Sequence, residues 1–226
     1  MGKTPKEILA EYEYNEINQL INKKVGDNLQ KIEYQYNIRN WLSGINLNSS
    51  GNIDNTKLFS YKIKYNNPLN NALKKFNGNI SEIDWVYQGE ISQRYEYSYD
   101  ELNRLKLANY KSIGQTTTTD SKFYNEQLSY DLNGNILNLK RNARPMYGQT
   151  AVLVDNLDYT YEGNRLTKIF DNTQNTSGYP AVMISQSISY DQNGNMTTMP
   201  DKGITEIKYN FLNLPKQITQ NGNTTS

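Results

Sequence analysis

Bulky and polar residues alternate along short segments of this chain, and many segments end in a tyrosine followed by a polar turn. The pattern is clearest in Y-N-E-I-N-Q-L from Tyr14, Y-D-E-L-N-R-L from Tyr99 and Y-D-L-N-G-N-I from Tyr130. A second bulky residue lies two positions earlier, as Tyr97 does before Tyr99. A spacing of two places both side chains on one face of a strand. The pattern therefore predicts strands that end at these tyrosines.

The residues after each tyrosine predict a turn of about four residues and then a new strand. Asn, Asp or Glu comes first, and an Asn or Asp side chain can accept hydrogen bonds from the backbone two residues on. Asn or Gly then stands where left-handed geometry is needed. An aliphatic residue resumes the strand, and these residues are Leu20, Leu42, Leu105, Ile136, Leu166 and Met196.

Eight copies of this unit divide the chain. They begin near Tyr14, Tyr36, Tyr65, Tyr99, Tyr130, Tyr161, Tyr190 and Tyr209, at intervals of 22, 29, 34, 31, 31, 29 and 19 residues. The copy at Tyr65 is degenerate, and the copy at Tyr161 is one residue short. The turn positions that define the repeat are Asn15, Asn37, Asp100, Asp131, Gly134, Asp191, Gly194 and Asn210.

The predicted fold class is all-β, with repeated antiparallel β-hairpins in a broad, twisted and curled sheet. Eight units of two strands, each about 5–6 residues long, predict roughly fourteen to sixteen strands in one repeat domain over residues 1–226. One segment competes with this pattern. Thr4-Pro5 resembles a helix start, so a short helix over 4–13 is the alternative to a strand that holds Tyr12 and Tyr14.

The amino-acid composition excludes many kinds of catalytic and metal-binding site. The sequence has 24 Lys and Arg against 23 Asp and Glu, and this balance argues against a nucleic-acid partner. It has no Cys and no His, so disulfides, thiol nucleophiles, histidine bases and Cys/His zinc sites are excluded. Nineteen tyrosines and 33 asparagines fit tyrosine-rich strands with asparagine turns. No apolar run is long enough for a membrane helix, and the first residues lack the apolar segment of a signal peptide.

The repeated Y-D-x-x-G-N/R-L units resemble the YD repeats of the RHS (rearrangement hot spot) family. The resemblance covers about residues 12–218, and three further segments carry it: F-N-G-N-I-S-E-I-D-W at 76–85, Y-N-I-R-N-W-L at 36–42 and K-G-I-T-E-I-K-Y-N-F-L-N-L-P at 202–215. In that family the repeats form a spiralling antiparallel sheet, which can build a shell around a C-terminal domain. The resemblance implies a bacterial protein that is secreted or exposed on the cell surface.

The same resemblance implies that this chain is one segment of a longer protein. The Asp-Pro-x-Gly segment that the family associates with self-cleavage has no counterpart here, so that activity is not carried over. As perfect sheet, 226 residues would cover roughly 3,600 Å². A wall around a guest of about 100 residues needs roughly 6,000 Å². We therefore expect a partial, non-enzymatic wall whose partners are the rest of its own chain and, through open edge strands, a second copy.

Three further groups of residues have both a structural and a functional interpretation. The turns at 131–135 and 191–195 resemble the start of a calcium loop, but Gly134 and Gly194 fall at the wrong position, so hairpin turns are favoured. Glu82, Asp84 and Glu90 near Trp85 resemble a glycosidase composition, although a solvated strand face explains them as well. Trp41 and Trp85 are expected in the core, and the alternative is a carbohydrate-binding, adhesin-like surface with a glycan as ligand. No cofactor and no metal is expected.

Overall fold

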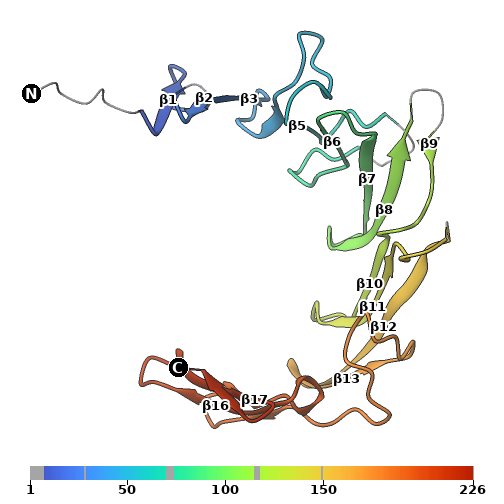
Figure 1. Ribbon diagram of the computed structural model, residues 1–226. Helices are drawn as coiled ribbons and strands as arrows, with labels where there is room; N and C mark the ends of the chain where they lie inside the picture. The colour runs from blue at the N-terminus through green and yellow to red at the C-terminus, as the bar shows by residue number, and fades with distance from the viewer. Residues whose placement is uncertain (1–7, 28, 70–73, 115–117, 149, 226) are drawn as a thin grey trace, which may run out of the picture. The chain divides into compact units, whose positions relative to one another are not determined.

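The computed structural model describes residues 8–225 apart from 28, 70–73, 115–117 and 149 (Figure 1). Half of the described residues are in strands and 1% are helical, and every pair of adjacent strands is antiparallel, so the predicted all-β hairpin fold is confirmed. Internal contacts divide the chain into two compact units, Met1–Ser121 and Lys122–Ser226. The single repeat domain stays a prediction, and each unit is described by itself.

In the first unit, consecutive strands pair in chain order (Figure 1). Because each strand turns back beside the one before it, only local hairpins are needed to build the sheet. The strands are β1 (Ala10–Tyr14), β2 (Leu20–Val25), β3 (Gln30–Tyr36), β4 (Leu42–Ile45), β5 (Phe59–Lys64), β6 (Glu82–Tyr87), β7 (Ser92–Tyr99), β8 (Leu105–Ile113) and β9 (Thr118–Thr119).

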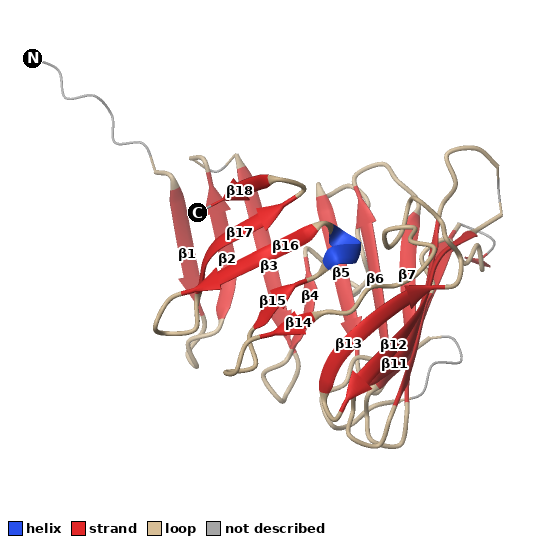
Figure 2. Ribbon diagram, turned by 90° about the horizontal axis from the view of Figure 1, so that it is seen from below, coloured by secondary structure: helices blue, strands red, loops and turns tan. Residues whose placement is uncertain are grey.

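The second unit holds the remaining strands and one short 3₁₀ helix, η1 (Pro200–Lys202), drawn in blue in Figure 2. Four strands pair in chain order, namely β10 (Glu126–Tyr130), β11 (Ile136–Ala143), β12 (Val152–Glu162) and β13 (Arg165–Asp171). A two-stranded sheet and a three-stranded sheet follow, formed by β14 (Ser189–Tyr190), β15 (Met196–Thr198), β16 (Ile204–Tyr209), β17 (Pro215–Gln220) and β18 (Asn223–Thr225).

The described residues hold eighteen strands, more than the fourteen to sixteen that eight hairpins predict. The excess has a local cause. β9 is a two-residue strand that pairs with the end of β8, and β18 adds a hairpin after the last tyrosine unit. Neither segment contains the tyrosine pattern that predicts a hairpin.

Each complete repeat carries the same β-bulge. The register shifts immediately before the repeat tyrosine, which then pairs with the residue that begins or nearly begins the next strand, as Tyr99 pairs with Leu105. One extra residue follows on the partner strand, for example Lys106 in that hairpin. A bulge of this kind bends a strand and increases its twist. The seven pairs are Tyr14–Leu20, Tyr36–Leu42, Tyr99–Leu105, Tyr130–Ile136, Tyr161–Leu166, Tyr190–Met196 and Tyr209–Pro215.

The apolar core of the second unit is small. Leu157 of β12 and Ile169 of β13 pack with Tyr179, Ile188 and Met199, all of them buried. The loop 172–188 brings Tyr179 and Ile188 into this core. A buried carboxylate anchors the loop, because the amide of Tyr179 donates to Asp155 Oδ1 at 2.6 Å.

Two predicted local structures need correction. Residues 10–14 form β1, so the helix alternative is wrong for that part of 4–13; residues 4–7 lie outside the described ranges. No five-residue turn follows Tyr65, because β5 ends at Lys64 and β6 begins only at Glu82. The segment Y-N-N-P-L lacks the asparagine or glycine that the other copies place at the left-handed position.

Candidate functional site

The turns after six of the repeat tyrosines share one hydrogen-bonding scheme. In the turn 100–104, the amide of Asp100 donates to the carbonyl of Arg104 at 2.9 Å. The Asp100 Oδ1 atom accepts from the amides of Leu102 and Arg104 at 3.0 and 2.9 Å. Asn103 adopts φ 63°, the left-handed conformation that the turn requires. The same carboxylate or amide oxygen acts in this way in Asn15, Asn37, Asp131, Asp191 and Asn210.

The position of left-handed conformation follows the predicted choice between asparagine and glycine. Gly134 and Gly194 occupy it with φ 93° and 83°, while Asn40 occupies it with φ 61°. Asparagine tolerates this conformation better than other residues that carry a Cβ, and glycine adopts it without strain. The turn chemistry read from the sequence is therefore what the backbone uses.

Six of the eight repeat tyrosines also join two neighbouring repeats, a function that the sequence pattern did not reveal. The Tyr190 hydroxyl donates to the carbonyl of Leu166 at 2.7 Å, and Leu166 is the aliphatic residue of the preceding hairpin. The acceptor lies beside the bulge, where the ladder is interrupted. The other pairs are Tyr36–Leu20 at 3.0 Å, Tyr65–Leu42 at 2.9 Å, Tyr99–Ile80 at 2.7 Å, Tyr161–Ile136 at 2.9 Å and Tyr209–Met196 at 2.7 Å.

Side-chain amides link adjacent turns along the same edge. Asn135 Nδ2 donates to Asn164 Oδ1 at 3.0 Å, and Asn195 Nδ2 donates to Asn213 Oδ1 at 3.0 Å. In the first unit, Gln19 Nε2 donates to Asn40 Oδ1 at 3.2 Å. The last residue of one turn thus contacts the left-handed residue, or its equivalent, in the next. This contact explains part of the high asparagine content.

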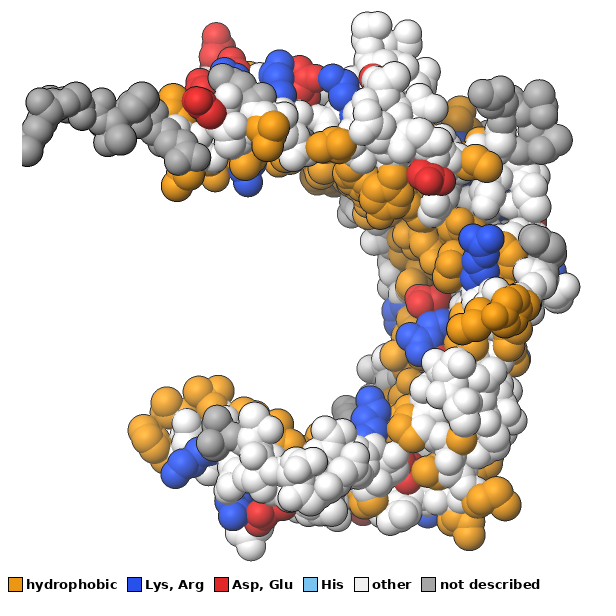
Figure 3. All heavy atoms as spheres, in the orientation of Figure 1, with side chains coloured by type: hydrophobic (Ala, Val, Ile, Leu, Met, Phe, Trp, Pro, Cys, Tyr) orange, Lys and Arg blue, Asp and Glu red, His pale blue; other side chains and the backbone are white. Residues whose placement is uncertain are grey.

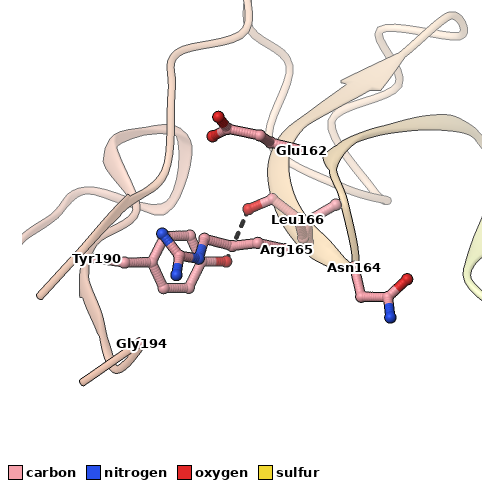
Figure 4. Close-up of a pocket in the computed structure, with 6 residues that line it drawn as sticks. All are labelled: Glu162, Asn164, Arg165, Leu166, Tyr190 and Gly194. Atoms are coloured by element: carbon pink, nitrogen blue, oxygen red, sulfur yellow. Dashed lines mark hydrogen bonds between the residues drawn. The ribbon is translucent and has the colours of Figure 1, made fainter. Parts of the chain in front are cut away.

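Between two such turns the second unit has an open groove of about 780 Å³ (Figure 4). The Arg165 guanidinium lies over the Tyr190 ring, 5.2 Å from its centroid, and the Tyr190–Leu166 hydrogen bond closes the inner end. The groove is lined by Glu162, Asn164, Arg165, Leu166, Tyr190 and Gly194. One cation–π pair and one carboxylate on an open surface form no catalytic arrangement, and the groove has the character of a repeat junction.

Trp41 lies at the corresponding junction of the first unit, in a groove of about 440 Å³. Its ring is 5.0 Å from the Tyr65 ring, and the Arg39 guanidinium lies 5.2 Å from its centroid. A side chain at Gly78 would touch its edge. Trp41 is thus half-buried and contacts several side chains, with the exposed side chains of Ile38 and Phe76 at the rim of the groove.

Trp85 lies elsewhere, on an aromatic face of β5 to β8 that we define as Phe59, Tyr61, Trp85, Tyr87, Tyr95, Tyr97 and Tyr110. The Trp85 and Tyr95 rings are stacked at 5.5 Å, and Tyr95 is also stacked with Tyr97 at 5.7 Å. Figure 3 shows hydrophobic side chains gathered over this part of the first unit. Tyr110 is buried, Trp85 is half-buried and Tyr87 is 52% exposed, so the rings cover one another and leave a rim in solvent.

The opposite face of the same strands buries charge. Lys64 of β5, Glu82 and Asp84 of β6 and Arg94 of β7 form what we call the ionic cluster, and their side chains are only 0% to 7% exposed. Lys64 Nζ contacts Glu82 Oε1 and lies 2.5 Å from Asp84 Oδ2. Arg94 donates from Nε to Asp84 Oδ1 at 2.6 Å and from Nη2 to Asp84 Oδ2 at 3.0 Å.

Two carboxylates and two cations cancel one another in this cluster, as buried charges require. Arg94 Nε is also 3.1 Å from Glu82 Oε1, and the amide of Leu69 donates to Glu82 Oε2 at 3.1 Å. The predicted solvated face is wrong for Glu82 and Asp84, which are buried, and it describes only Glu90, which is exposed. The three acids therefore form no open pair across a cleft.

The calcium-like turns use their carboxylates internally. Asp131 Oδ2 accepts from Asn135 Nδ2 at 2.7 Å, and this hydrogen bond is the main reason that the pKa of Asp131 is lowered. Asp191 is arranged in the same way with Asn195 at 2.9 Å. Within the described residues, no group of three or more acidic side chains is placed to hold a metal ion. None of the helices in the part of the chain that is described is long and apolar enough to cross a membrane.

Comparison with known proteins gives a likeness in structure only. No family model matches the sequence, and no curated protein matches it. Two crystal structures are similar, those of TcdB2-TccC3-Cdc42 and of TcdB2-TccC3-TEV, each with a TM-score of 0.47. Identity is 12% and 10%, and in both the match covers 93% of this chain and 12% of the other. The chain thus spans about an eighth of the length of the chains it matches.

Proposed function

We propose that this chain is a non-enzymatic structural segment of a longer repeat protein, part of a wall or scaffold of the RHS type. The recurring hydrogen bond from a repeat tyrosine to the preceding repeat is the observation that carries the proposal. It recurs at six of the eight repeat tyrosines, and each time it joins two successive hairpins. Repetition of one bulge, one turn and one such link adds hairpin after hairpin in the same direction, and extension is what a wall needs.

The distribution of carboxylates supports the same role. Glu82 and Asp84, two of the three acids that the sequence suggests for catalysis, are neutralised in the ionic cluster, and the turn aspartates Asp131 and Asp191 act as acceptors within their own turns. A general acid and base need carboxylates that can reach a substrate. A scaffold needs polar groups that are satisfied internally, which is how these side chains are used.

The protein's position in the cell belongs to the same proposal. We place it outside the cytoplasm, secreted or on the cell surface, as the repeat resemblance implies. The experiment reads the gene on both sides of these codons and fractionates cells that express the native protein. We expect further Tyr-Asx repeats in the same reading frame and protein in the medium or surface fraction. A reading frame without further repeats, together with a cytoplasmic protein, would overturn the proposal.

A second candidate is carbohydrate binding at the Trp41 groove. The observation in its favour is the composition of the groove, where Tyr36, Trp41, Tyr65 and Phe76 meet Arg39 without a carboxylate in the lining. Glycan-array binding that is lost in Trp41→Ala would support it. The matched change Trp85→Ala lies outside the groove and is expected to leave such binding intact. Absence of binding to every glycan on the array would contradict this candidate function.

A further inference from the structure

The ionic cluster places an amine against a carboxyl group in a site that excludes water. Lys64 Nζ is 2.5 Å from Asp84 Oδ2, and both side chains are almost completely buried. They belong to adjacent antiparallel strands, on which Lys64 pairs with Glu82 and Lys62 pairs with Asp84, so Lys64 reaches Asp84 along the diagonal. Two reactants held in contact react as if at very high concentration, with effective molarities of about 10⁵–10⁸ M in favourable cases.

The two other members of the cluster stand where a condensation would need them. Glu82 Oε1 contacts Lys64 Nζ and can relay its protons. Arg94 donates one hydrogen bond to each oxygen of Asp84, at 2.6 and 3.0 Å, and these donors stabilise negative charge that develops on that carboxyl group. The four residues therefore supply a nucleophile, an electrophile, a proton relay and an oxyanion donor.

We propose that Lys64 and Asp84 condense to an intramolecular amide bond, with Glu82 as the proton relay. One proton passes from the Lys64 ammonium through Glu82 to Asp84, which leaves a neutral amine and a neutral carboxylic acid. The Nζ lone pair attacks Cγ of Asp84 and forms the new C–N bond. A second proton passes from Nζ through Glu82 to the leaving hydroxyl, the C–O bond breaks, and one water molecule departs.

The charges balance before and after the reaction. Lys64, Arg94, Glu82 and Asp84 sum to zero, and the product retains Glu82 and Arg94, whose Oε1 and Nε atoms are 3.1 Å apart. The bond removes one buried cation and one buried anion, and so it removes the free-energy cost of keeping those two ions away from water. The same burial protects the amide from hydrolysis. These 226 residues include no cysteine, so this bond would supply a covalent cross-link within a segment that has no disulfide of its own.

The test is the intact mass of the full chain, measured under denaturing conditions after purification. We expect a mass lower by one water molecule than the sequence requires. Trypsin should then fail to cut after Lys64, and a branched peptide should hold Lys64 and Asp84 together. Wild-type protein at its full calculated mass would overturn the proposal, as would a link to Glu82 in place of Asp84. A water loss that maps to a cyclised aspartate elsewhere would overturn it too.

Variants of Lys64, Asp84 and Glu82 test which side chains take part in the reaction, and the mass of the wild-type protein remains the main test. Lys64→Arg keeps the positive charge but not the amine, and it should have the full mass. Asp84→Asn should lose ammonia instead of water if the link still forms. Glu82→Gln keeps the shape of the relay and should slow or stop the mass loss. The control is Lys111→Arg, since Lys111 forms an ordinary pair with Glu96 at 2.7 Å, and this change should leave the mass loss in place. If Lys64→Arg fails to fold, the wild-type mass still decides.

Discussion

The Tyr190 hydroxyl donates to the Leu166 carbonyl at 2.7 Å and so connects β14, in a two-stranded sheet, to β13, in the preceding four strands of the second unit. The regular strand ladder ends between those two sheets, where the amide of Ile188 still donates to the carbonyl of Thr167 at 2.9 Å, and the tyrosine side chain adds a second link across the junction. Tyr209 does the same at the next junction, where its hydroxyl reaches the carbonyl of Met196 in β15. The repeat thus uses tyrosine for its hydroxyl as well as for its ring.

Tyr190→Phe should therefore destabilise the second unit. The change deletes one hydroxyl and leaves the half-buried Leu166 carbonyl without this donor, and we expect a loss of about 1–2 kcal/mol in the free energy of unfolding. Urea unfolding measures the loss, and hydrogen exchange should place it between β13 and β14. The control is Tyr147→Phe, because Tyr147 is 86% exposed. Equal stability of the two variants would contradict the role given to the hydroxyl.

Removal of Arg94 should be far more costly than removal of a surface cation. Arg94→Met leaves one buried negative charge uncompensated, whether or not Lys64 and Asp84 have condensed, and we expect a loss of about 3–5 kcal/mol in unfolding free energy. Lys24→Met breaks an exposed pair with Glu11, so a loss below about 1 kcal/mol is expected. Chemical denaturation of both variants makes the comparison. Similar losses would show that the ionic cluster is not as buried as described.

Gly178 should not tolerate a methyl group. A Cβ at this position would overlap the Val154 carbonyl oxygen and the Asp155 carboxylate, and the backbone atom cannot move aside easily. Gly178→Ala should destabilise the second unit by about 1–3 kcal/mol. The neighbouring change Ser177→Ala is a matched control because Ser177 is exposed. Thermal unfolding of the pair would distinguish them, and a stable Gly178→Ala protein would refute the close approach.

The turn aspartates should make stability depend on acid pH. Hydrogen bonds from Asn135 and Asn195 lower the pKa values of Asp131 and Asp191 in the folded state below the ordinary value of 3.8. Their contribution is present above that value and is lost as pH falls through the folded pKa. Urea midpoints measured from neutral to acid pH should fall in this window. Asp191→Asn should reduce the fall, and an unchanged profile would contradict the assignment.

Alkaline pH should weaken the hydrogen bonds of the repeat tyrosines, because the pKa values of these groups are raised in the folded state, whereas those of the turn aspartates are lowered. Burial raises the pKa values of Tyr99, Tyr161 and Tyr190 above the ordinary value of 10.0. The unfolded chain therefore loses these protons at lower pH than the folded chain, so stability falls as pH rises from about 10 toward the folded values. Absorbance of tyrosinate, followed together with unfolding midpoints, tests this expectation. Stability that is constant over that range would count against it.

Sequence pattern was sufficient for the hairpins because their determinants are local. Tyr99, Asp100 and Asn103 lie within five residues, and their spacing alone specifies a strand end, an acceptor and a left-handed residue. The same pattern N-S-S-G-N forms an equivalent turn at 48–52, with Asn48 as the acceptor, although no tyrosine precedes it. The turn signal N-x-x-G-N therefore forms the same structure without a preceding tyrosine.

The bulges and the ionic cluster could not be read in this way. A bulge is a relation between two strands, and only a break in alternation such as Leu20-Ile21 or Ile136-Leu137 gives a sign of it. Lys64 and Asp84 are twenty residues apart in the sequence. The two-residue period of a strand places each side chain on one face of the sheet, but it does not show whether loops cover that face. Burial of that face depends on the segments that follow β4 and β5, where Ser60 and Glu82 accept or donate hydrogen bonds to loop residues.

Every hairpin with the bulge is registered at its tyrosine end, and this leaves the opposite end free to vary in length. The connection between β2 and β3 is residues 26–29, whereas the connection between β13 and β14 is residues 172–188. Such insertions do not displace the next tyrosine from its carbonyl acceptor, because the following strand is aligned again at its own turn. Evolution, or a protein engineer, can therefore graft new segments at those connections while the repeat itself stays in step.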